Sequence, residues 1–99
     1  MPIVIQMCIS FDPAKARRNV AEHGVTFEDA QAVLLDPHAI TREDDDAKSE
    51  QRFLSLGLGA NGLVLVVVWT LRDHGDEVRL ISAWKTNAQQ SKRYDNQFI

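Results

Sequence analysis

The longest unbroken run of apolar side chains extends from Leu63 to Trp69 and is rich in valine. Asn61-Gly62 precedes this run, and a polar turn at residues 72–76 follows it. An apolar run of this length between turn signals is typical of a strand buried on both faces, because valine loses side-chain freedom in a helix. We therefore predict a strand at Leu63–Thr70 in the centre of a sheet.

Strands are also predicted on both sides of this central strand. Arg52–Leu58 alternates between two faces and is joined to the central strand by the short loop at residues 59–62. Val78–Lys85 follows the polar turn. Period-two alternation divides the side chains of this last strand into two sets, namely Trp84 with Val78, Leu80 and Ser82, and Lys85 with Arg79, Ile81 and Ala83.

Two helix signals lie in the first third of the chain. Asp12 can cap a helix that Gly24 stops in a left-handed conformation, and Thr26 can cap a second helix that ends at Asp36-Pro37. The second helix carries an apolar stripe with the spacing of a core-facing surface, formed by Phe27, Ala30, Val33 and Leu34.

The remaining elements are strands at Ile3–Phe11 and His38–Arg42 and a last helix at Ala88–Phe98, which Thr86-Asn87 can cap. The order is then β-α-α-β-β-β-β-α. Strands that follow one another through short loops indicate a mainly antiparallel sheet of four to five strands with the helices packed on one face. We predict a single α+β domain over residues 1–99, with two N-terminal helices and one C-terminal helix.

The net charge of −3 is concentrated in one segment. Residues 43–50 hold five carboxylates and one lysine, a local charge of −4, which leaves +1 for the rest of the chain. This distribution argues against a broad basic face but allows a local nucleic-acid site. The acidic run lacks the glycine and spacing of a calcium loop, and no His or Cys pair has zinc spacing, so we expect no metal site and no cofactor.

Cys8 is the only cysteine, which rules out an internal disulfide and favours a reducing cytoplasm. We expect Cys8 to be a small core residue rather than a nucleophile. The first residues lack the pattern of a signal peptide, and no segment approaches the ~20 apolar residues of a membrane span. The sequence therefore predicts a cytoplasmic protein that does not enter a membrane.

Three segments resemble the BrnT family of bacterial type II toxins. FDPAKARRNVAEHGVTFEDA at residues 11–30 is similar to the opening of that family. SEQRFLSLGLGANGLVLVVVWT at residues 49–70 resembles its central hairpin, and VRLISAWKTNAQQSKRYD at residues 78–95 resembles its closing strand and helix.

This resemblance implies a compact RelE-like fold and a ribonuclease that cuts RNA without a metal and inhibits translation. It also implies a BrnA-like antitoxin, a ribbon-helix-helix protein that neutralises the toxin and represses the operon, so that the toxin would reach DNA only through the antitoxin. A heterotetramer with the antitoxin is one assembly that this would allow, although the sequence does not set the stoichiometry.

Two positions depart from the family pattern. The family usually reads ISAR where this chain reads Ile81-Ser82-Ala83-Trp84, and its last helix usually carries a glutamate where Gln90 stands. Lys85 keeps a positive charge beside the missing arginine, but it would replace that arginine only if the strand ended or bulged there. A second hypothesis is therefore a catalytically weak or inactive homologue that binds the antitoxin as a co-repressor module. A third is an unrelated α+β domain.

Metal-free RNA cleavage needs a base for the 2′-hydroxyl, cations for the crowded phosphorane and an acid for the leaving 5′-oxygen. Arg72 and Trp84 are candidates for RNA binding, Trp84 by stacking on a base. The candidates for catalysis are His23, Glu50, Arg52, Arg79 and Lys85.

Each candidate also has a structural explanation. His23 could stabilise the end of the first helix, Glu50 could be a solvated member of the acidic loop, and Arg52 could pair with that loop. Trp84 could be covered by the last helix. The acidic loop itself could deter RNA and attract a basic arm of the antitoxin.

Overall fold

The computed structural model describes residues 8–48 and 50–98. Its elements follow the predicted order: β1 Cys8–Ser10, α1 Pro13–His23, α2 Phe27–Leu35, β2 Ile40–Glu43, β3 Arg52–Leu58, β4 Val64–Arg72, β5 Glu77–Lys85 and α3 Ala88–Asp95. Single turns of 3-10 helix follow β4 at Asp73–Gly75 and α3 at Asn96–Phe98. The part of the first predicted strand at residues 3–7 lies outside the described residues.

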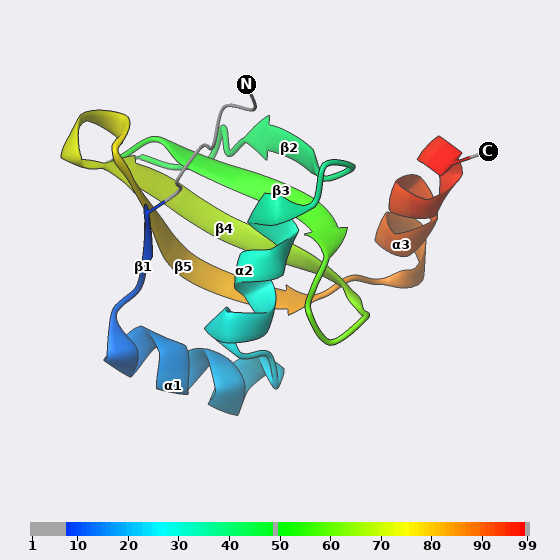
Figure 1. Ribbon diagram of the computed structural model, residues 1–99, viewed down its shortest axis with the longest axis horizontal. Helices are drawn as coiled ribbons and strands as arrows, with labels where there is room; N and C mark the ends of the chain where they lie inside the picture. The colour runs from blue at the N-terminus through cyan, green and yellow to red at the C-terminus, as the bar shows by residue number, and fades with distance from the viewer. Residues whose placement is uncertain (1–7, 49, 99) are drawn as a thin grey trace, which may run out of the picture.

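The five strands form one sheet in the order β1-β5-β4-β3-β2, so the strand predicted to be central is central (Figure 1). Strands β2 to β5 form an antiparallel meander as expected. However, β1 pairs with β5 in parallel, which makes the sheet mixed rather than purely antiparallel. The two helices and three strands between β1 and β5 allow the chain to return in the same direction, and no local pattern in β1 signals that pairing.

Helices α1 and α2 cover one face of the sheet and enclose the core (Figure 1). The buried core consists of Val25, Phe27, Ala30, Val33, Leu65, Val67, Leu80 and Ala83. The apolar stripe predicted for the second helix supplies three of these side chains. Burying each large apolar side chain contributes roughly 1.5–3 kcal/mol, so this cluster is the main source of stability.

The helix caps form largely as predicted. The Asp12 carboxylate accepts a hydrogen bond from the Ala14 amide, and Gly24 ends α1 with a φ of 68°. The Thr26 hydroxyl accepts from the amide of Asp29. At α3 the capping box is formed by Asn87 and Gln90. Thr86, the other residue predicted to cap this helix, donates its hydroxyl hydrogen bond to the carbonyl of Val64 instead.

A β-bulge lies in β5. Val68 pairs with Ser82, whereas the next residue of β4, Trp69, pairs with Leu80. Ile81 is therefore the extra residue on β5, and the alternation of side chains along β5 changes phase at this point.

The bulge makes the predicted face assignment for Val78–Lys85 wrong. Leu80 and Ala83 both lie in the core beneath the helices. Arg79 pairs with Thr70 on the opposite face of the sheet, which also carries Ser82 and Trp84 through their β4 partners. A strand with strict period-two alternation would have placed Arg79 and Trp84 on different faces.

The exposed edge of β5 is closed by a side chain of α1. Asn19, which is only 4% exposed, donates from its amide nitrogen to the carbonyls of Ala83 and Val25 at 2.8 and 2.9 Å. Its amide oxygen accepts from the backbone N–H of Ala83 at 3.0 Å. Because β1 pairs only with the first part of β5, Asn19 takes the place of a neighbouring strand at Ala83.

Two further observations concern the exposure of Cys8 and the helices' ability to cross a membrane. Cys8 is exposed at the beginning of the edge strand β1, so the expectation that it is a core residue is wrong. Within the described ranges, none of the helices combines the length and the apolar character that crossing a membrane requires.

Candidate functional site

The face of the sheet opposite α1 and α2, which we call the open face, gathers arginines from four strands and one helix. It carries five of the eleven basic side chains of the protein: Arg42 on β2, Arg52 on β3, Arg72 on β4, Arg79 on β5 and Arg93 from α3. The charge distribution along the sequence had argued against a broad basic face. The structure brings arginines that are far apart in the chain together on one surface, but it also places Glu50 and Glu77 among them, so it does not overturn that prediction.

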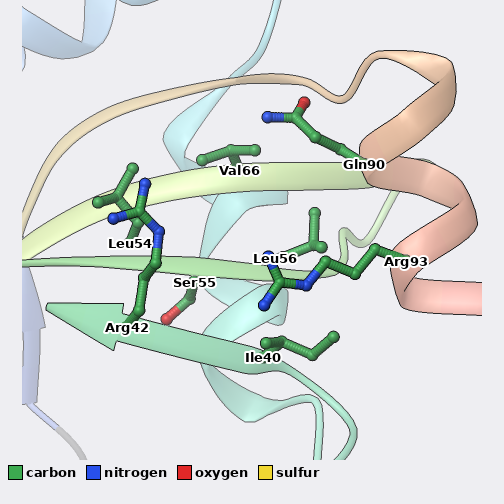
Figure 2. A pocket seen from close by; sticks show the side chains of 8 residues that line it. All are labelled: Ile40, Arg42, Leu54, Ser55, Leu56, Val66, Gln90 and Arg93. Carbon is green, nitrogen blue, oxygen red and sulfur yellow. The ribbon is translucent and has the colours of Figure 1, made fainter. Parts of the chain in front are cut away.

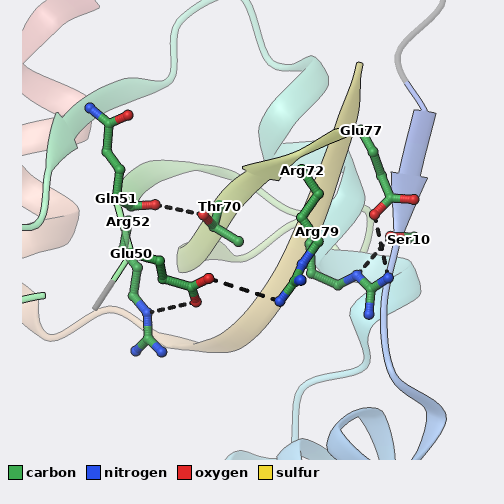
Figure 3. Close-up of polar contacts among 8 residues, drawn as sticks. All are labelled: Ser10, Glu50, Gln51, Arg52, Thr70, Arg72, Glu77 and Arg79. Carbon is green, nitrogen blue, oxygen red and sulfur yellow. Dashed lines mark hydrogen bonds and ion pairs between the residues drawn. The ribbon is translucent and has the colours of Figure 1, made fainter. Parts of the chain in front are cut away.

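Three of these arginines meet two glutamates at one end of the open face, and we call Glu50, Arg52, Arg72, Glu77 and Arg79 the arginine cluster (Figure 3). Glu50 lies between two guanidinium groups. Its Oε1 is 3.4 Å from Nε of Arg52, and its Oε2 is 3.9 Å from Nη2 of Arg72. All members of the cluster are partly exposed to solvent, so a phosphate can reach them.

Arg79 occupies the second half of the cluster. Its Nε donates to the hydroxyl of Ser10 at 2.9 Å, and its Nη2 donates to Oε2 of Glu77 at 3.3 Å. The parallel pairing of β1 with β5 brings Ser10 beside Arg79. These contacts hold the guanidinium group in a defined position while one third of the side chain stays exposed.

A buried threonine separates the two central arginines. Thr70 pairs with Arg52 on one side and with Arg79 on the other, so the three residues form a row across three strands. Two strand spacings put the backbones of the arginines roughly 10 Å apart. The Thr70 hydroxyl donates to the carbonyl of Gln51 at 2.6 Å and fixes the start of β3 (Figure 3). The sequence analysis did not select Thr70. A threonine at the end of an otherwise apolar strand does indicate a side chain that forms a specific hydrogen bond.

The remaining candidates lie at the other end of β5. His23, Trp84, Lys85 and Glu22 line a shallow hollow of about 580 Å³. The rings of His23 and Trp84 are 6.0 Å apart, and Nε2 of His23 is 3.9 Å from the Glu22 carboxylate. Lys85 is part of β5 and pairs with Leu65, so it points to the opposite face from Trp84.

The structure therefore divides the candidate residues into two groups. Arg79 and Trp84 are five positions apart on β5, which corresponds to roughly 15 Å. Glu50, Arg52, Arg72 and Arg79 lie together in the arginine cluster, whereas His23, Trp84 and Lys85 lie in the hollow at the other end of β5. Trp84 shares its hollow with residues of α1 rather than α3.

The acidic loop, residues 43–50, adjoins the arginine cluster. The amide of Asp44 donates to the carbonyl of Arg52 at 2.7 Å, and Glu50 belongs to both the loop and the cluster. In the parts of the chain that are described, no three His, Cys, Asp or Glu side chains are arranged to hold a metal ion.

The position of α3 depends on a carboxylate at the end of α2. Asp36 accepts hydrogen bonds from the Tyr94 hydroxyl and from the amides of Leu58 and His38. Burial raises the pKa of Asp36, but these three hydrogen bonds outweigh it, and the pKa lies below its ordinary value. Burial and the bond to Asp36 raise the pKa of Tyr94 to about 12. Through this contact α3 is held beside the open face.

The comparisons with known proteins agree on one family. Residues 11–90 match the family described as ribonuclease toxin, BrnT, of type II toxin-antitoxin system. The crystal structure of the Brucella abortus ribonuclease toxin BrnT is similar to this chain with a TM-score of 0.63 and 21% sequence identity. The similarity covers 83% of this chain and 99% of the Brucella chain. Among curated proteins, none matches the chain significantly.

Proposed function

Since the chain belongs to the BrnT family of ribonuclease toxins of type II toxin–antitoxin systems, we propose that it cuts RNA without a metal, inhibits translation in the cytoplasm and is neutralised by a BrnA-like ribbon-helix-helix antitoxin. The observation that carries this proposal is the arginine cluster on the open face. We group the fold with the RelE-like ribonucleases, as the resemblance in sequence implied.

In the proposed reaction the 2′-oxygen of a ribose attacks the adjacent phosphorus, and the bond to the 5′-oxygen breaks. Glu50 accepts the proton of the 2′-hydroxyl, since it is the only carboxylate of the cluster placed between two arginines. Arg52 and Arg79, on either side of Thr70, stabilise the charge on the phosphorane. Arg72 binds a neighbouring phosphate. The products are a 2′,3′-cyclic phosphate and a 5′-hydroxyl.

His23, Trp84 and Lys85 have a different role in this proposal. They lie too far along β5 to donate a proton at the arginine cluster, so the leaving 5′-oxygen takes its proton from solvent. Trp84 stacks on a base of the flanking RNA, and His23 and Lys85 attract its phosphates. A protein with this arrangement lacks a positioned general acid, which contributes typically 10²–10⁴-fold to a rate. Cleavage should therefore be slow.

The antitoxin would engage the acidic loop. Residues 43–50 carry a charge of −4 and adjoin the arginine cluster, so a basic arm of the antitoxin could bind the loop and block access to the cluster. The toxin would then contact DNA only through the antitoxin, in a heterotetramer or another assembly of the two chains.

A second function is favoured by two specific observations. Glu50 partly neutralises Arg52 and Arg72, and Trp84 brings no charge to the open face. Both features would suit a catalytically weak homologue that serves as the antitoxin-binding co-repressor.

Induction of the protein alone in a bacterial host distinguishes these two functions. A ribonuclease toxin should slow growth, and co-expression of the antitoxin should restore it. The matched control is the double variant Arg52→Ala with Arg79→Ala at equal soluble expression. Normal growth with the wild-type chain at high soluble expression would remove the ribonuclease proposal and leave the co-repressor.

A further inference from the structure

A small groove lies between the open face and α3, away from the arginine cluster (Figure 2). Its floor is formed by aliphatic side chains of three strands: Ile40, Leu54, Leu56 and Val66. The groove has a volume of about 140 Å³. Pockets for drug-sized ligands are roughly 300–1,000 Å³, so this one suits a single flat ring rather than a helix of a partner protein.

The rim of the groove is positively charged. Arg42 approaches from β2 and Arg93 from α3, and Figure 2 shows both guanidinium groups lying over the sheet. Among the residues that the structure describes, neither arginine forms an ion pair with a carboxylate. An apolar floor between two such cations fits a ligand that is flat and uncharged in the middle and anionic on both sides.

A third rim residue, Gln90, presents hydrogen-bond donors. Its Oε1 accepts from the backbone N–H of Asn87 at 3.0 Å in the capping box of α3. This bond fixes which end of the amide faces the helix, and the NH₂ group is directed to the side of Val66 (Figure 2). Because Tyr94 anchors α3 to Asp36, the donors of Gln90 are held in place before any ligand arrives.

We propose that this groove is a nucleotide subsite that holds one base of single-stranded RNA. The base lies on the aliphatic floor, its edge accepts a hydrogen bond from Gln90, and the phosphates on its two sides contact Arg42 and Arg93. This inference rests on the proposed ribonuclease function. It adds the residues that select the base close to the phosphodiester that is cleaved.

The distance between the groove and the arginine cluster supports this assignment. Leu54 and Leu56 lie two and four residues after Arg52 on the same face of β3. These separations correspond to roughly 7 and 13 Å along the strand. A base in the groove and a phosphodiester at the cluster can thus belong to one short stretch of RNA.

The test is equilibrium binding of a short unstructured RNA that is 2′-O-methylated throughout, so that it has no 2′-hydroxyl nucleophile. Fluorescence anisotropy at a series of KCl concentrations gives the salt dependence of the binding constant. Each lost phosphate contact should reduce the slope of log K against log[salt] by about 0.7 for a single strand. We expect this reduction in Arg42→Gln and in Arg93→Gln, and an unchanged slope in the control Arg18→Gln, which removes an exposed arginine of α1.

Base selection is tested with Gln90→Met on four oligonucleotides that differ at one position. The preference among the bases should fall on the order of fivefold, the lower end of what hydrogen-bonded base contacts provide. Asn87→Ala is the control, because it breaks the same capping box and leaves the Gln90 amide in the chain. An equal loss of preference in both variants would overturn the assigned role of Gln90.

Salt slopes that equal the wild-type slope in both arginine variants would overturn the subsite, as would a wild-type chain that does not bind the oligonucleotide. If the arginine variants bind RNA normally but lose the antitoxin, the groove belongs to the protein partner instead. A parallel cleavage assay with unmodified RNA separates the two proposals. Binding that responds to the groove variants without any cleavage would retain the subsite and remove the ribonuclease.

Discussion

Replacing Asn19 with alanine should destabilise the protein by several kcal/mol. The substitution removes three hydrogen bonds and leaves the carbonyl of Val25 and both backbone polar groups of Ala83 without their partner. Val25 and Ala83 are at most 1% exposed, so water does not replace the amide without local opening. Each stranded group costs about 1–3 kcal/mol.

Allowing for some solvation at the edge of β5, we expect a loss of about 3–5 kcal/mol in the free energy of unfolding, out of the ~5–15 kcal/mol typical of a domain. The melting temperature should fall by at least about 12 °C, at 4 °C or more per kcal/mol for a domain of this size. Urea unfolding followed by circular dichroism measures the loss.

Two variants control this experiment. Arg18→Ala changes the preceding, exposed position and should stay within about 0.5 kcal/mol of the wild type. Asn19→Asp keeps the size of the side chain but exchanges both donors for a carboxylate that faces two carbonyls, so it should be at least as unstable as Asn19→Ala at neutral pH. A loss below about 1 kcal/mol in Asn19→Ala would refute the reasoning that this side chain replaces a strand.

The remaining predictions concern other parts of the chain. Trp84→Arg should weaken RNA binding, because it removes the ring that stacks on a base, and should leave single-turnover cleavage at saturating protein unchanged, because position 84 lies roughly 15 Å along β5 from Arg79; a higher cleavage rate would show that a cation at position 84 reaches the reacting phosphate. Tyr94→Phe should lose about 1.5–3 kcal/mol of stability, the usual value of a hydrogen bond to a charged group. Because the pKa of Tyr94 is raised to about 12, wild-type stability should be complete below pH ~10 and fall as the pH rises from about 10 to 12; a Tyr94→Phe titration with the same decline would contradict this origin. At the acid end, the lowered pKa of Asp36 should make stability fall below pH ~4. His74→Gly should stabilise the protein by about 0.5–1 kcal/mol, since His74 has a φ of 56° that glycine adopts without strain; an unfolding midpoint at or below the wild-type midpoint would contradict that.

The elements of the fold could be predicted because their signals are local. The apolar run before Thr70 marked the central strand, and Asp12 and Thr26 marked two helix starts that the structure confirms. The bulge could not be predicted in the same way. Ile81 is a normal strand residue, and its extra position exists only relative to the partner strand. One unpaired residue therefore reversed the expected faces of half of β5.

The candidate site was predictable in its residue types but not in its grouping. Arg52 and Arg79 were selected as cations, but their position on either side of Thr70 follows from pairings between three strands. Arg42 and Arg93 were not selected, because they are ordinary surface arginines in the sequence and meet only where α3 approaches the sheet. A parallel pairing that depends on the whole fold brings Ser10 to Arg79.

Single-turnover cleavage of an unstructured RNA in excess chelator tests the central claim most directly. The wild-type chain should cut the RNA and leave a 2′,3′-cyclic phosphate. Arg52→Ala and Arg79→Ala should each be slower by ~10²–10³, as for loss of one transition-state donor. Both arginines form only partly exposed ion pairs, so each variant should stay within about 1 kcal/mol of wild-type stability. Arg18→Ala should cut at the wild-type rate. A folded wild-type chain that leaves the RNA intact, or that cuts it equally fast without Arg52 and Arg79, would contradict the account.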